Sequence, residues 1–235
     1  MRVLVPRGSA VGQRASLAED EAHHLRVRRA HEGEAVEVLD GAGLTGRGRL
    51  VRARAEWLVE IESAERQPVG PELILAVAAG DRERFTWMAE KAVELGVTEI
   101  VPLETSRTLG VATRLRATHT EKLRRIVLEA TKQCGAAWAP EVQTPSPLAD
   151  FLARPLGGAG WLADAAGEMP PAQLERTPLS VVIGPEGGFT TEERAEILSS
   201  GYRPVVLGSN TLRFETAAVA AAATIGTARM RGNHG

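Results

Sequence analysis

The sequence predicts an α/β protein in which a mostly parallel sheet is preceded by a small barrel of antiparallel strands. From Val3 to about Arg66, short stretches of alternating polar and apolar residues are separated by Gly and Asp, whereas apolar runs alternate with helical segments from residue 73 onward. Period-two alternation is typical of half-buried strands, and strands that alternate with helices form a parallel sheet covered on both faces. We therefore expect one domain at residues 1–67 and another at 72–235.

The first domain is expected to contain strands interrupted by one helix. Ser16 and Glu19 have the spacing of a capping box, in which both side chains accept hydrogen bonds from backbone N–H groups at a helix start. The helix should run from there through His23, His24 and Leu25. The strands are expected at residues 34–39, 46–54 and 57–61.

Gly41, Gly43 and Gly46 match the spacing G-x-G-x-x-G of dinucleotide-binding loops. Such a loop opens a helix, but residues 47–52 are interrupted by glycine and alternate like a strand. A hairpin turn that needs positive φ angles explains these glycines better, so an NAD-dependent enzyme is the weakest alternative.

The second domain is expected to alternate strands and helices throughout. Thr190 and Glu193 form a second capping box, and Gly96 and Gly135 end two of the helices. Ligands of parallel sheets bind beyond the carboxyl ends of the strands. The strands are expected at residues 73–78, 99–103, 160–163, 180–183 and 204–207, and the helices at 84–95, 120–134, 191–200 and 215–230.

Composition indicates a globular, cytoplasmic protein. With 43% hydrophobic residues and a net charge of -2, the chain of 235 residues can fill a core and is not a polycation. Its single cysteine, Cys134, cannot form an internal disulfide, and no apolar run reaches the roughly 20 residues that cross a bilayer. His23 and His24 would point about 100° apart on a helix and cannot share a metal ion. We expect neither a membrane partner nor a metal.

Residues 184–188, Gly-Pro-Glu-Gly-Gly, are the first candidate for a functional site. They follow an apolar strand and precede the capped helix. One glycine is enough for such a turn, so three of them around a carboxylate indicate backbone brought close to a ligand. The Gly-Lys-Ser/Thr of a phosphate loop is missing, and a nucleoside triphosphate is not implied.

Residues 207–217, Leu-Gly-Ser-Asn-Thr-Leu-Arg-Phe-Glu-Thr-Ala, are the second candidate. They join a strand to the last helix, and an ordinary loop with a helix cap is the alternative. The concentration of Arg, Glu and two Thr in an otherwise apolar environment favours a binding role, because unpaired polar groups are costly there.

In order along the chain, these segments resemble the RsmE family of 16S ribosomal RNA uridine-N3 methyltransferases. Residues 23–28 and 39–41 are similar to that family's PUA-like RNA-binding barrel. At 132–136 the chain has Lys-Gln-Cys-Gly-Ala where the family usually has Glu-Gln-x-Gly-Arg, which leaves open any role of this turn in RNA binding or in an interface. The other matching segments are residues 91–97, 100–103, 183–189, 207–208 and 212–217.

The resemblance implies a SPOUT-type methyltransferase domain with a C-terminal trefoil knot, and a homodimer. The cofactor would be S-adenosyl-L-methionine. The substrate would be the N3 atom of a uridine in 16S rRNA on the small ribosomal subunit, uridine 1498 in the usual numbering. Carried over position by position, the cofactor-binding residues are Leu162, Ala163, Gly184, Glu186, Gly188, Leu207, Gly208, Ser209, Thr211, Leu212, Arg213 and Thr216.

Arg213 and Glu186 are the candidates for catalysis. Methylation at N3 requires loss of a weakly acidic N–H and stabilisation of the resulting anion. The Arg213 guanidinium stays cationic and offers a planar fork of donors for that anion. Glu186 would act as a base or order the glycine turn, and we favour ordering because carboxylates are poor bases for so weak an acid.

The expected RNA-binding residues are pairs of arginines spaced two apart, which strand-like alternation would place on one face of the barrel. A merely solvated strand face is the alternative. A ribose 2′-O-methyltransferase of the SPOUT class and a non-catalytic RNA-binding factor would share many of these features. The arginines are Arg26, Arg28, Arg47, Arg49, Arg52 and Arg54, with Arg107 in the second domain.

Overall fold

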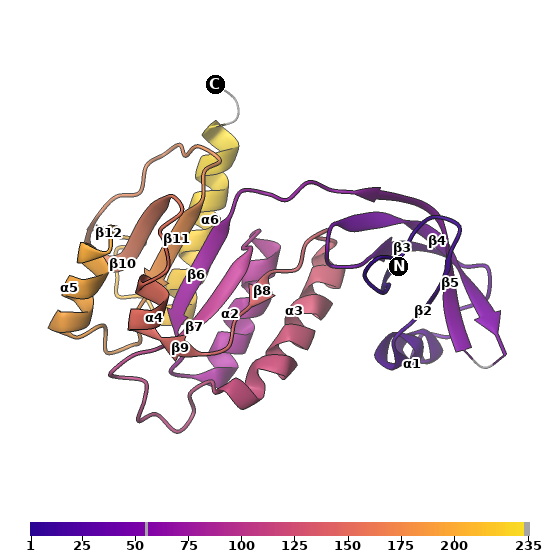
Figure 1. Ribbon diagram of the computed structural model, residues 1–235, viewed down its shortest axis with the longest axis horizontal. Coiled ribbons are helices and arrows are strands. Elements are labelled where there is room, and N and C mark those ends of the chain that lie inside the picture. The colour runs from indigo at the N-terminus through magenta and orange to yellow at the C-terminus, as the bar shows by residue number, and fades with distance from the viewer. Residues whose placement is uncertain (55, 233–235) are drawn as a thin grey trace. The chain divides into compact units, whose positions relative to one another are not determined.

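The computed structural model describes residues 1–54 and 56–232 (Figure 1). The chain divides into two compact units. The N-terminal unit comprises Met1–Val69 together with Leu128–Ala139, and the second unit comprises Gly70–Val127 with Pro140–Gly235. The segment Leu128–Ala139 therefore packs with the N-terminal unit although it lies far beyond the linker in sequence. No single boundary in the sequence describes this division.

The N-terminal unit is built on a five-stranded sheet in the order β1-β3-β4-β5-β2. The expected strands β3, β4 and β5 pair antiparallel, and the additional strand β1 pairs parallel with β3. Leu25 of the helix packs with Leu50 and Val59 of the sheet in a buried core. The elements are β1 (Arg2–Leu4), β2 (Arg14–Ser16), α1 (Glu19–Val27), β3 (Ala35–Leu39), β4 (Leu44–Ala53) and β5 (Glu56–Arg66).

One capping prediction for this unit is wrong and one turn prediction is confirmed. Ser16 is the last residue of β2, where it pairs with Leu58, so it cannot cap α1, which starts after Ala18 without a side-chain cap. Gly41 and Gly43 have φ angles of 63° and 100° between the antiparallel strands β3 and β4. They serve a hairpin, as predicted, and no helix follows them.

The second unit contains a seven-stranded sheet in the order β12-β10-β11-β6-β7-β8, with β9 also paired to β7. All of these pairings are parallel, as predicted. Its elements are β6 (Leu73–Ala78), α2 (Arg82–Glu94), β7 (Glu99–Glu104), the 3-10 helix η1 (Ala117–His119), the first part of α3 (Thr120–Cys134), β8 (Glu141–Val142), β9 (Ser146–Pro147), α4 (Leu148–Leu152), β10 (Ala159–Glu168), β11 (Leu179–Ile183), α5 (Thr191–Ser199), β12 (Tyr202–Val205) and α6 (Phe214–Gly232).

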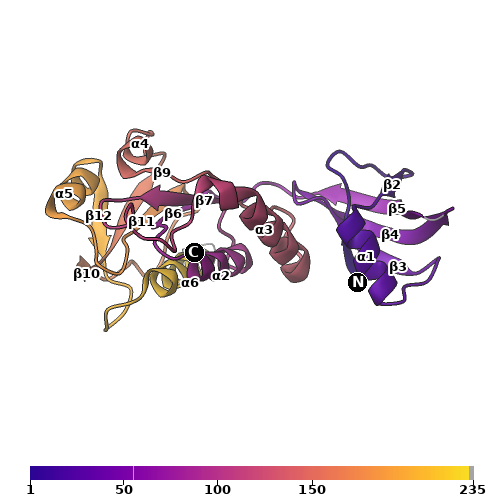
Figure 2. The ribbon, with the colours of Figure 1, turned by 90° about the horizontal axis from the view of Figure 1, so that it is seen from below.

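Helices cover both faces of this sheet. The helices α4 and α5 lie on one face and α2 and α6 on the other (Figure 2). On the first face, Phe151 of α4 and Ile197 of α5 pack against Leu162 and Val182 of the strands. Because both faces of the sheet are buried, the sequences of its strands are continuous apolar runs. The trefoil threading implied by the resemblance stays a prediction.

None of the helices among residues 1–54 and 56–232 combines the length and the apolar character needed to cross a membrane.

Candidate active site

A cavity of about 380 Å³ lies at the carboxyl ends of β11 and β12 and is also lined by residues 162–165 of β10. This edge of a parallel sheet is where ligands bind, and the volume lies in the range of small-molecule sites. Three of the twelve predicted cofactor residues, Ser209, Arg213 and Thr216, do not line it and are exposed. The structure brings the other nine together: Leu162, Ala163, Gly184, Glu186, Gly188, Leu207, Gly208, Thr211 and Leu212.

The glycine-rich turn at residues 184–188 joins β11 to α5 along one wall of the cavity. Gly188 has a φ angle of 73°, in the left-handed region that favours glycine. A Cβ atom at Gly184 would lie only 3.0 Å from the ring of Phe189, another lining residue. Thr190 and Glu193 then cap α5 reciprocally, which confirms that capping box. The sequence of the turn thus sets both the path of the backbone and the start of the helix.

Glu186 points its carboxylate at a cation from another element. The Arg84 guanidinium of α2 donates a hydrogen bond to Glu186 Oε1 at 3.0 Å. Both side chains are about half exposed, and Arg84 is not among the cavity-lining residues. This contact is the one expected if Glu186 orders the turn.

Arg107 lies across the outside of the same turn. Its Nη1 atom donates to the carbonyl oxygen of Gly188 at 3.5 Å, and its Cδ atom lies 3.1 Å from where a Cβ atom of Gly187 would be. The neighbouring Ser106 N–H donates to Glu193 Oε1 at 2.7 Å. A side chain predicted to bind RNA is therefore beside the cavity.

The carboxylate of Glu193 is held in its ionised form. Burial alone would raise the pKa of Glu193, but hydrogen bonds from the backbone N–H groups of Ser106 and Thr190 lower it below its usual range. An ionised carboxylate at the first turn of α5 also interacts favourably with the helix dipole. These contacts fix the segment that carries Arg107 against the start of α5.

Sequence reasoning missed an ion pair in the cavity lining, formed by Asp164 and Arg194. Arg194 Nε donates a hydrogen bond to Asp164 Oδ2 at 2.9 Å, and Nη2 lies 2.9 Å from the same oxygen in an ion pair. The hydrogen bond from the Ala166 N–H lowers the pKa of Asp164 against the opposing effect of burial, and the hydrogen bond and positive charge of Arg194 lower it further. Two signals could have found the pair: Asp164 directly follows the apolar part of β10, and Arg194 lies in the first turn of the helix that follows the glycine-rich turn.

Arg213 is the predicted catalytic residue that lies outside the cavity lining. Its carbonyl oxygen accepts a hydrogen bond from Ala217 N–H at 2.8 Å, so its backbone belongs to the first turn of α6. Its exposed guanidinium has no hydrogen bond or ion pair with any described residue. A substrate could therefore reach it without displacing another group.

The arginines of the N-terminal unit do not form the single face that was predicted. Arg47 and Arg49 flank the buried Gly48, but Arg52 is on the same side of β4 as the buried Leu50 and lies over the Trp57 ring at 4.8 Å. Side chains alternate along a strand, so positions whose numbers differ by an odd number, such as 49 and 52, lie on opposite sides. The second arginine pair therefore points away from the first. The prediction of one shared face is wrong for that reason.

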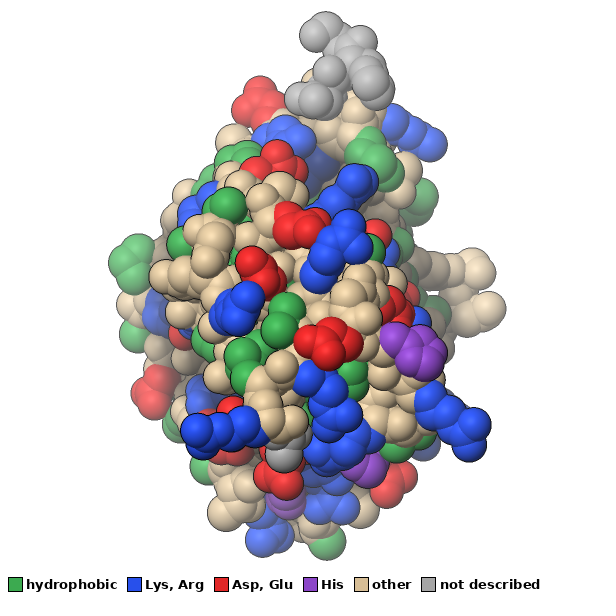
Figure 3. Space-filling model, turned by 90° about the vertical axis from the view of Figure 1, so that its right-hand side faces the viewer, with side chains coloured by type: hydrophobic (Ala, Val, Ile, Leu, Met, Phe, Trp, Pro, Cys, Tyr) green, Lys and Arg blue, Asp and Glu red, His purple; other side chains and the backbone are tan. Residues whose placement is uncertain are grey.

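These arginines also differ in their partners. Arg28 pairs with Glu34, and Arg49 pairs with Glu62 at 2.7 Å. The side chains of Arg26, Arg47 and Arg54 have no hydrogen-bond or ion-pair partner within residues 1–54 and 56–232. The face turned to the viewer in Figure 3, which includes this unit, shows many basic side chains with acidic ones between them.

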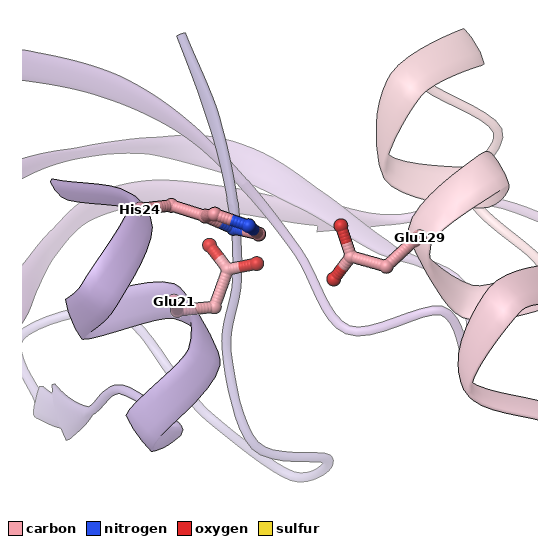
Figure 4. A group of neighbouring side chains, drawn as sticks. All are labelled: Glu21, His24 and Glu129. Atoms are coloured by element: carbon pink, nitrogen blue, oxygen red, sulfur yellow. The ribbon is translucent and has the colours of Figure 1, made fainter. Parts of the chain in front are cut away.

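A cluster of Glu21, His24 and Glu129 in the N-terminal unit has the composition of a metal site. The three side chains point toward one another from α1 and α3 (Figure 4). Lys132 Nζ forms ion pairs with both carboxylates, with Glu129 at 2.6 Å. Burial alone would lower the pKa of Lys132, but hydrogen bonds to the two glutamates raise it. The ammonium group of Lys132 therefore supplies the positive charge of the cluster.

Two family models match different parts of the chain, and both describe domains of RNA methyltransferases. A family model described as an RNA methyltransferase domain matches residues 65–226. A second model, described as an RNA methyltransferase PUA domain, matches residues 17–56.

Individual relatives agree with these models over most of the chain. The ribosomal RNA small subunit methyltransferase E of Aquifex aeolicus is 31% identical, over 86% of this chain and 90% of its own. The protein of the same name from Synechocystis sp. is 30% identical, over 95% of this chain and 76% of its own. The crystal structure of the enzyme of that name from Neisseria gonorrhoeae, bound to S-adenosyl methionine, superposes with a TM-score of 0.84 at 27% identity and covers 94% of each chain.

Proposed function

Because the chain belongs to the family of ribosomal RNA small subunit methyltransferase E, we propose that it transfers a methyl group from S-adenosyl-L-methionine to the N3 atom of a uridine in 16S ribosomal RNA. The observation that carries this proposal is the cavity at residues 162–165, 184–189 and 206–212. The glycine turn and the segment before α6, which carry the family resemblance, form two of its three walls.

The lining residues fit this cofactor. Leu207, Leu212 and Phe214 offer an apolar surface for a flat adenine ring, and the glycines leave backbone groups accessible. The only charged side chains of the lining are Asp164, Glu186 and Arg194. When bound, the cofactor would supply an electrophilic methyl group with its own leaving group.

The protein's own groups then have to orient the uracil and stabilise its charge. Arg213 is proposed to donate to the developing uracil anion, because its guanidinium stays cationic and is free among the described residues. Glu186 is proposed to hold the glycine turn through Arg84 rather than to remove the N3 proton. Positioning and charge stabilisation would supply most of the rate.

The proposed substrate is uridine 1498 in the small ribosomal subunit of the cytoplasm, and the proposed assembly is a homodimer. Arg107 supports this choice of substrate because it lies beside the cavity wall, where it could contact RNA next to the target base. Arg26, Arg47 and Arg54 are proposed to contact RNA phosphates because their charges are not neutralised by a described neighbour. We expect Arg28, Arg49 and Arg52 to contribute less to RNA binding, because Arg28 and Arg49 are in ion pairs and Arg52 lies over the Trp57 ring.

The test is methyl transfer from radiolabelled S-adenosylmethionine to small subunits that lack the modification, followed by digestion to nucleosides and mass spectrometry. We expect the label in a uridine methylated on its base. A label on the ribose would instead indicate a 2′-O-methyltransferase. Cofactor binding without transfer to subunits or to free 16S rRNA would reject the proposed substrate, and no cofactor binding would indicate an RNA-binding factor.

A further inference from the structure

Two of the three charges in the cavity lining belong to one ion pair. Glu186 is hydrogen-bonded to Arg84, which lies outside the lining. Asp164 and Arg194 are both lining residues and bind each other. The pair therefore places a positive and a negative group side by side in a cavity whose one other charged lining residue, Glu186, is already bound to Arg84.

A local irregularity of β10 positions Asp164. Ala163 and Glu168 both pair with Val205 of β12, so residues 164–167 leave the regular ladder between them. Gly167 permits this path, because a Cβ atom there would lie 2.4 Å from the backbone nitrogen of Val205. Bulges are found next to functional sites, where they redirect a side chain. Here the irregularity begins at the residue whose carboxylate lines the cavity.

The pair keeps hydrogen-bonding capacity for a ligand. Asp164 Oδ1 accepts one bond, from Ala166 N–H at 2.9 Å, although a carboxylate oxygen can accept two. Arg194 donates one hydrogen bond to Asp164, from Nε, with Nη2 in ion-pair contact with the same oxygen, and a guanidinium has five N–H groups. The side chains of Asp164 and Arg194 are 20% and 44% exposed, respectively. An acceptor and several donors thus remain accessible.

We propose that Asp164 and Arg194 bind the amino-acid end of S-adenosylmethionine, with Asp164 accepting from its α-ammonium group and Arg194 donating to its α-carboxylate. This inference rests on the cofactor assignment of the proposed function. Adenine and ribose are neutral, whereas the amino-acid end carries two opposite charges on one carbon atom. A charged group taken into a cavity needs an oppositely charged partner, and adjacent opposite charges match a zwitterion.

The test measures binding rather than turnover. Isothermal titration calorimetry would compare S-adenosylmethionine, S-adenosylhomocysteine and 5′-methylthioadenosine, which lacks the amino-acid end. The variants are Asp164→Asn and Arg194→Gln, and Glu196→Gln is the matched control, because Glu196 is an exposed residue of the same helix as Arg194. Binding of 5′-methylthioadenosine reports whether the cavity of each variant is intact.

We expect each variant to weaken binding of both S-adenosylmethionine and S-adenosylhomocysteine by about 10- to 100-fold, the usual cost of losing a charge-assisted hydrogen bond. Affinity for 5′-methylthioadenosine and all affinities of the control should be unchanged.

Other outcomes overturn the inference in distinct ways. Equal weakening of all three ligands would mean that the pair holds the ribose or shapes the cavity. Weakening of S-adenosylmethionine alone would assign the pair to the sulfonium charge, and no weakening would remove it from recognition. If the wild-type protein binds none of the three, the cofactor assignment itself fails, and this inference fails with it.

Discussion

The Arg84 guanidinium of α2 donates to Glu186 Oε1 at 3.0 Å and so connects α2 to the glycine-rich turn of the cavity wall. The two residues are far apart in sequence, and the contact gives the carboxylate a structural partner before any substrate binds. The carboxylate therefore already has a role in the structure that requires no proton transfer.

Replacement of Glu186 by Gln should therefore leave catalysis largely intact. The amide oxygen can still accept from Arg84, so we expect kcat to stay within about tenfold of wild type, whereas loss of a general base typically costs about 10²- to 10⁴-fold. Single-turnover methyl transfer to small subunits measures this, with Glu196→Gln as the control. A drop of a thousandfold would make Glu186 the base.

Replacement of Arg213 should separate chemistry from cofactor binding. Its side chain does not line the cavity, so Arg213→Ala should leave the Kd for S-adenosylmethionine unchanged while kcat falls by about 10²- to 10³-fold. Arg213→Lys should recover only part of the rate, because lysine keeps the charge without the planar fork. Arg231→Ala, an exposed change at the far end of α6, is the control. Wild-type turnover of Arg213→Ala would remove the assignment.

Two glycines with the same backbone conformation allow strain to be separated from function. Gly188 in the turn and Gly96 after α2 have φ angles of 73° and 74°, and a Cβ atom at Gly96 would meet nothing within 4 Å. Replacement by Ala should lower the free energy of unfolding by about 1 kcal/mol at either position. Only Gly188→Ala should also weaken cofactor binding, measured by calorimetry. Equal cofactor affinity of the two variants would contradict the role of the turn.

RNA binding should depend on which arginines are already neutralised. Arg47 has no partner among the described residues, whereas Arg49 is paired with Glu62. Arg47→Ala should reduce the slope of log Kd against log salt concentration by about 1, as expected for the loss of one phosphate contact. Arg49→Ala should change it less. Identical salt slopes for wild type and Arg47→Ala would exclude this residue from the RNA interface.

Regular elements of the second unit could be predicted from sequence because burial leaves a clear pattern. The strand at Leu73–Ala78 is a continuous apolar run and was predicted with its observed bounds. The five-residue helix α4 was missed, since one and a half turns are too short for helical periodicity to show. The capping prediction for Ser16 was wrong for a different reason. It rested on the spacing between neighbouring residues, whereas the pairing of Ser16 with Leu58 joins segments far apart in the sequence.

The cavity could be predicted only in part. Gly184 was found because three glycines directly after a strand indicate close backbone approach, whereas Gly208 was found through the family resemblance. The pairing of Asp164 with Arg194 was missed because a parallel sheet brings together segments that the sequence separates, and only the fold shows which loops share a wall. The opposite orientations of Arg49 and Arg52 follow from the strand register, which simple spacing of arginines does not give.

The central claim is best tested at the modified nucleotide itself. Methylation at N3 occupies the pairing edge of uracil and stops reverse transcriptase. Primer extension on 16S rRNA from unmodified small subunits, incubated with this protein and S-adenosylmethionine, should therefore stop just before uridine 1498. Without S-adenosylmethionine, reverse transcriptase should read through this position. Readthrough at uridine 1498 despite full incorporation of labelled methyl groups would contradict the proposed function.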